Sequence, residues 1–76
     1  MYKDKLTNDY IKNGFRNHLP EELVPKGFGL VAWKWRLNKW IEKEKQKGYY
    51  DDNDFDRLID RHIEWTAQLI MKEREA

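Results

Sequence analysis

The amino-acid sequence predicts an all-α fold: a small three-helix domain built on a long antiparallel helical hairpin, with an N-terminal helix and a connector containing proline and glycine packed on it. Three observations lead to this prediction. Apolar residues recur every three or four positions along two long segments, helix-stopping residues separate the segments, and a chain of 76 residues suits a single domain. Residues 1–76 are therefore expected to form one helical domain.

The first helix is expected over residues 3–13. Tyr2, Leu6 and Tyr10 lie four residues apart, which is the spacing of one helical face. Gly14 follows this segment, and glycine commonly ends a helix because it adopts the left-handed conformation without strain. The N-terminal helix is therefore predicted to be short.

A connector follows, because residues 15–29 contain two prolines and two glycines, which interrupt any long helical period. Residues 20–24 are expected to form one short turn, since proline is tolerated at a helix start and disfavours helix in the residue before it. Gly27 and Gly29 are expected to let the chain turn closely into the next helix.

Two long helices are predicted to form the hairpin. The first covers residues 28–47 and is ended by Gly48, with lysines in its last turn as the helix dipole prefers. The second covers residues 53–74, with Asp52 or Asn53 as its N-cap and acidic residues in its first turn.

One apolar stripe on each long helix is expected to face the other. The stripe of the first comprises Leu30, Trp33, Leu37, Trp40, Ile41 and Glu44. The stripe of the second comprises Phe55, Leu58, Ile59, His62, Trp65, Thr66, Leu69 and Ile70. Tryptophans within such a stripe usually pack in the core, so Trp33 and Trp40 are expected to be structural.

Trp35 falls on the reverse side of its helix, close to Phe28 and Val31. Two interpretations remain open. In the favoured one the N-terminal helix and the connector cover this second patch, since a helix that is apolar all round is normally buried all round. In the other, Trp35 stays exposed among Lys34, Arg36 and Lys39 as a binding site, because exposed aromatic and basic groups often dominate interfaces.

The net charge of +1 hides an asymmetry along the chain. Residues 26–48 contain seven basic and two acidic side chains, whereas residues 49–76 contain four basic and eight acidic ones. Such a distribution can steer a charged partner. It can equally be neutralised internally, with the basic helix lying beside the acidic one, and this second explanation is favoured for so small a chain.

Catalytic chemistry is not expected. Serine and cysteine are absent, so the usual nucleophilic triads cannot form. His18 has no evident acidic or nucleophilic partner nearby, and His62 lies within a core stripe, where a structural imidazole is more common than a catalytic base. The chain is therefore predicted not to be an enzyme and to need no cofactor.

A metal site is not expected either. Asp52, Asp54 and Asp56 alternate as in a calcium loop, but Arg57 replaces the required glycine and Ile63 stands where the bidentate glutamate belongs. Asp56, Asp60 and Glu64 lie on one helical face at four-residue spacing, but three exposed carboxylates without a closed cage of ligands bind cations weakly.

These exclusions leave a small protein-interaction module, such as an inhibitor, adaptor or regulatory subunit, as the predicted function. Two surfaces are expected to bind the protein partner, whose identity the sequence does not indicate. The basic aromatic surface comprises Trp35, Lys34, Arg36 and Lys39, and the acidic surface comprises Asp56, Asp60 and Glu64. Self-association through Trp35 and Val31 remains open.

The alternative function is nucleic-acid binding by the basic middle helix, with lysines on phosphates and Trp35 on a base. The small net charge and the acidic last helix weigh against it. No membrane association is predicted, because the chain contains no long apolar run, signal peptide or lipidation motif. A cytoplasmic location is expected, and small proteins of this kind are common in bacteria and their phages.

Overall fold

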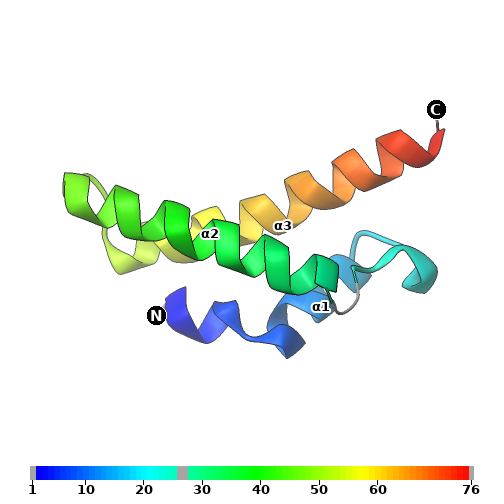
Figure 1. Ribbon diagram of the computed structural model, residues 1–76, viewed down its shortest axis with the longest axis horizontal. Helices are drawn as coiled ribbons and strands as arrows, with labels where there is room; N and C mark the ends of the chain where they lie inside the picture. The colour runs from blue at the N-terminus through cyan, green and yellow to red at the C-terminus, as the bar shows by residue number, and fades with distance from the viewer. Residues whose placement is uncertain (1, 26–27, 76) are drawn as a thin grey trace.

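The computed structural model describes residues 2–25 and 28–75 and confirms the all-α fold class (Figure 1). Its elements are two 3-10 helices and three α-helices, in the order η1 (Tyr2–Leu6), α1 (Asn8–Arg16), η2 (Glu21–Leu23), α2 (Phe28–Lys47) and α3 (Asp52–Glu75). These two described ranges contain no β-strand. Figure 1 shows α2 and α3 running in opposite directions and joined by a short turn, with η1 and α1 along one side of them.

Thr7 determines where α1 begins. Its backbone is extended, and its Oγ1 accepts a hydrogen bond from the backbone N–H of Tyr10 at 3.2 Å, so Thr7 is the N-cap. The α-helix therefore starts at Asn8 instead of residue 3, and η1 precedes it. α1 also continues past Gly14, where the sequence predicted its end.

The turn between α2 and α3 is defined at both ends by local backbone chemistry. Gly48 has a φ of 75°, the left-handed conformation that ends α2 as expected. Asp51 and Asp54 cap α3 reciprocally: the Asp54 N–H donates to Asp51 Oδ1 at 2.9 Å, and the Asp51 N–H donates to Asp54 Oδ2 at 3.1 Å. The N-cap is thus Asp51, one residue before the two candidates named from the sequence.

The core contains residues from every element except η2. Its buried apolar side chains are Tyr2, Ile11, Phe15, Leu19, Val24, Leu30, Leu37, Ile41, Phe55, Ile59, Ile63 and Ala67. On α3 the buried set differs from the predicted stripe. Ile63 and Ala67, which the stripe omitted, are buried, whereas Trp65 and Leu69, which it included, are 60% and 43% exposed.

Residues 2–16, called here the N-terminal segment, cause this difference because they pack against α3. An ideal Cβ at Gly14 would lie only 3.0 Å from Cγ2 of Ile63, so the two helices approach closely there. Near the hairpin turn, the rings of Tyr2 and Phe55 lie 5.4 Å apart. α3 therefore turns Ile63 toward the N-terminal segment, and Trp65, on another side of the helix, stays outside the core.

The expectation that the N-terminal segment covers the reverse side of α2 is wrong. Val31 and Trp35 are each 62% exposed, because the segment lies on the face shared by α2 and α3 and meets α2 through contacts such as Phe15 with Trp33, whose ring centroids are 5.5 Å apart. Gly27 and the Phe28 side chain, which the sequence assigned to the close turn and to this patch, lie outside the described residues.

Gly14→Ala tests the close approach of α1 to α3. We expect it to lower the free energy of unfolding by about 1 kcal/mol, because overpacking against buried Ile63 outweighs the better helix propensity of alanine. Urea denaturation followed by circular dichroism measures the change. Gly29→Ala is the matched control, because no heavy atom lies within 4 Å of its added methyl group. Equal stabilisation by both substitutions would contradict this packing.

Candidate interaction surfaces

The outer edge of α2, defined by Val31, Trp35 and Lys39, faces solvent. These residues are four positions apart and so lie on one side of the helix. The Lys39 ammonium lies 5.5 Å from the centroid of the Trp35 ring, a distance at which the cation and the aromatic face attract each other. The edge therefore presents one indole, one aliphatic side chain and one positive charge together.

The other two residues predicted to accompany Trp35 point elsewhere. Lys34 is half-buried and donates from Nζ to Asn8 Oδ1 at 2.7 Å, so it joins α2 to the start of α1. Arg36 is exposed but lines a groove on the opposite flank of α2. Of the predicted basic aromatic surface, the structure brings only Trp35 and Lys39 together.

Asp60 of the predicted acidic surface takes part in the fold. One carboxylate oxygen accepts from Lys5 Nζ at 2.7 Å, and the other accepts a short hydrogen bond from the Tyr10 hydroxyl. Lys5 also donates to the backbone carbonyl of Asp56 at 3.4 Å. Asp60 thus connects both η1 and α1 to α3, and a substitution there alters the fold's own contacts as well as a surface charge.

This network shifts the pKa values of its three members. Burial raises the pKa of Asp60, but the hydrogen bonds from Lys5 and Tyr10 outweigh it, so the pKa lies below its usual value. The hydrogen bond to Asp60 raises the pKa of Lys5 and also that of Tyr10. The folded state therefore favours the form in which Asp60 is ionised while Lys5 and Tyr10 keep their protons.

The remaining acidic residues are not equivalent. Asp56 is half-buried and lies one helical turn before Asp60. Glu64 is exposed and lines a pocket on the α3 surface with Arg61 and Gln68. Glu64 is therefore the member of the predicted acidic surface that remains most accessible to a partner.

A surface that the sequence did not predict lies between α2 and α3, on the face away from the N-terminal segment. This open groove has a volume of about 380 Å³ and is lined by Trp33, Arg36, Leu37, Trp40, His62, Trp65, Thr66 and Leu69. It continues across α3 into the pocket lined by Glu64, because His62 and Trp65 line both. Aromatic and aliphatic groups dominate the groove.

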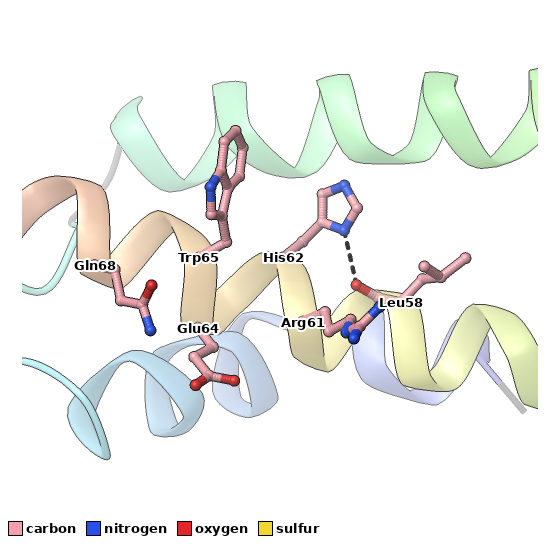
Figure 2. Close-up of a pocket in the computed structure, with 6 residues that line it drawn as sticks. All are labelled: Leu58, Arg61, His62, Glu64, Trp65 and Gln68. Atoms are coloured by element: carbon pink, nitrogen blue, oxygen red, sulfur yellow. Dashed lines mark hydrogen bonds between the residues drawn. The ribbon is translucent and has the colours of Figure 1, made fainter.

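Two of its tryptophans are held in place. The Trp33 indole N–H donates to Thr66 Oγ1 at 3.0 Å, and the Trp40 ring packs against the His62 ring with centroids 5.1 Å apart. His62 in turn donates from Nδ1 to the Leu58 carbonyl at 2.7 Å, since a carbonyl oxygen can only accept. Figure 2 shows His62 and Trp65 extending from α3 toward α2, while Glu64 points to the other side of α3.

Sequence reasoning missed the groove because it assigned to one partner helix a single apolar stripe of α3, which included Trp65 and Leu69 but omitted Ile63 and Ala67. The useful signal was the width of the whole apolar arc, which includes Ile63 and Ala67 on one side and Trp65 and Leu69 on the other. When the apolar arc of a helix is too wide to be covered by one neighbouring helix, either a second element packs on it or some of its apolar side chains stay exposed. Here the N-terminal segment takes one side, and Trp65 and Leu69 are the remainder.

The described His, Asp and Glu side chains form no group of three or more that is arranged to hold a metal ion. None of the helices in the described part of the chain is long and apolar enough to span a bilayer. Comparison with known proteins found no family model, no curated protein and no solved structure that matches the chain. The surfaces described above are thus the basis for any functional argument.

Asp60→Asn tests the network that holds the N-terminal segment. A lowered pKa means that the ionised carboxylate stabilises the fold above its unfolded pKa of about 3.9, and this stabilisation is lost as the pH falls through the folded pKa. We expect the variant to melt at a lower temperature than the wild type at pH 7. The loss in free energy of unfolding should be less than about 1 kcal/mol, because the side chain is 48% exposed. Thermal melts from pH 7 to pH 2 measure the difference, which should shrink with acid.

Glu64→Gln is the control for Asp60→Asn, because Glu64 lies on the same helix and is exposed. It should melt like the wild type throughout this pH range. A difference between Asp60→Asn and the wild type that stays constant down to pH 2 would contradict the assigned role of the carboxylate. The network should also lose stability at high pH. Because the pKa values of Lys5 and Tyr10 are raised in the folded state, their protonated forms stabilise the fold, and this stabilisation is lost above about pH 10.

Proposed function

We propose that this chain is a small non-catalytic module that binds a protein partner, acting as an inhibitor, adaptor or regulatory subunit. The observation that carries the proposal is the exposure of Trp35. Its side chain is 62% exposed and belongs neither to the buried core nor to the residues packed against it. Tryptophan is among the residues that contribute most to binding energy at protein interfaces. A reducing compartment such as the cytoplasm suits a chain without cysteine.

The composition of the outer edge supports a protein partner with an apolar centre and acidic surroundings. Val31 and Trp35 supply adjoining apolar area, and Lys39 places a positive charge over the indole. A partner carboxylate near Lys39 would gain an ion pair while an aliphatic side chain packs on Val31. Both interactions use side chains that are already exposed, so the core does not have to rearrange.

Nucleic-acid binding remains the second candidate, because an exposed tryptophan beside a lysine can also stack on a base next to a phosphate. The edge offers one such aromatic ring, however, and the acidic residues of α3 would repel a long polyanion. The protein partner is therefore preferred.

Trp35→Ala is the direct test. An affinity-tagged chain, expressed in the cells from which it originates, should recover one stoichiometric protein, and the purified pair should bind about tenfold or more weakly in the variant. Isothermal titration calorimetry measures the affinity. Circular dichroism should be unchanged, because the side chain lies outside the core. Tyr49→Ala, which truncates an exposed aromatic residue in the hairpin turn, is the control and should bind normally.

Two outcomes would overturn the proposal. Unchanged affinity in Trp35→Ala would remove the outer edge of α2 from partner binding. Tight binding to labelled single-stranded DNA or RNA that weakens steeply with salt and is lost in Lys39→Glu would assign the surface to nucleic acid instead. Glu64→Arg, which avoids the contacts of Asp60, tests whether the acidic side of α3 also contributes.

A further inference from the structure

We propose that the open groove binds an acidic amphipathic helix of a protein partner. This inference rests on the proposed protein-binding function, but it names a second surface and the chemistry of its occupant. The groove lies on the opposite flank of α2 from Trp35, so the two surfaces can be tested independently.

The shape of the groove fits a helix. On α3 the groove and its continuation follow Leu58, His62, Trp65 and Leu69, which are separated by four, three and four residues and therefore form one continuous stripe. From first to last the stripe is about 16 Å long at 1.5 Å per residue, or about three helical turns. A partner helix with apolar residues at the same spacing would complete a three-helix packing against α2 and α3.

The groove is also rigid enough to recognise a preformed shape. Trp33 is fixed by its hydrogen bond to Thr66 and by its contact with Phe15, and Trp40 is fixed against His62. Trp65 is 60% exposed and projects toward α2 (Figure 2). Such a side chain in a partly enclosed apolar site is typical of an interface anchor.

Charge at the edges of the groove specifies the acidic character of the partner. Arg36 lines the α2 edge, and Arg61 lines the continuation across α3. Glu64 lines that continuation too, but its side chain points to the other side of α3 (Figure 2). Among the described side chains no ion pair joins α2 to α3, and neither Arg36 nor Arg61 forms one. These charges are thus available to Asp or Glu residues that flank the apolar stripe of a partner helix.

The same charges disfavour the other occupants. A second copy facing the groove would bring one positively charged edge against another. A nucleic acid would find two of the three indoles already packed, Trp33 on Phe15 and Trp40 on His62, which leaves Trp65 as the accessible ring for stacking. An acidic helix satisfies both the charged edges and the apolar floor.

Selection from a displayed library of random peptides of about 16 residues, roughly four helical turns, against the immobilised chain tests the proposal. The recovered peptides should carry apolar residues at helical spacing flanked by Asp or Glu, and should gain helical circular dichroism on binding. Their affinity should fall about tenfold or more in Trp65→Ala and in Arg36→Glu, both of which change exposed side chains. Trp35→Ala, on the other flank of α2, and Tyr49→Ala, in the hairpin turn, are controls and should bind normally.

Recovery of no peptide, or of peptides without an acidic bias that bind Trp65→Ala as well as the wild type, overturns the groove proposal. A dimer in sedimentation that dissociates in Trp65→Ala assigns the groove to a second copy, and oligothymidine binding lost in that variant assigns it to nucleic acid. Both results overturn the acidic helix. Peptides lost only in Trp35→Ala overturn the groove while leaving the proposed protein-binding function intact.

Discussion

The contact between Gly14 and Ile63 governs the arrangement of the whole molecule. The absence of a side chain at Gly14 lets α1 approach α3 until an added Cβ would stand 3.0 Å from the isoleucine. Because α3 must present Ile63 to α1 and Phe55 and Ile59 to the rest of the core, its rotation about its own axis is determined. The exposure of Trp65 follows from that rotation, as does the groove between α2 and α3.

The elements themselves were largely predictable, because they depend on local chemistry. The fold class, both long helices and the end of α2 at Gly48 follow from helical periodicity and from the left-handed backbone of one glycine. The end of α1 was not predictable in this way. Gly14 resembles a helix stop in sequence, but its role in the fold is close packing, which only the position of α3 reveals.

The surfaces were harder to predict, because a helical wheel gives the direction of a side chain without naming its neighbour. The helical wheel correctly places Trp33 and Trp35 on different sides of α2. Whether Trp35 is covered, however, depends on the path of the N-terminal segment. In the sequence Asp60 looked like a free surface charge. It instead accepts hydrogen bonds from Lys5 and Tyr10, which are 55 and 50 residues away in the chain. Long-range contacts of this kind leave no periodic signal in a sequence.

The hydrogen bond from Trp33 to Thr66 has a thermodynamic consequence for recognition. A large side chain that is still free to rotate loses conformational entropy when a ligand immobilises it, and that loss weakens association. Trp33 and Trp40 lose this entropy during folding, through their contacts with Thr66 and His62. Most of the ordering cost at the groove would therefore fall on the incoming molecule, so an occupant that is already helical in solution has an affinity advantage over a disordered one of the same composition.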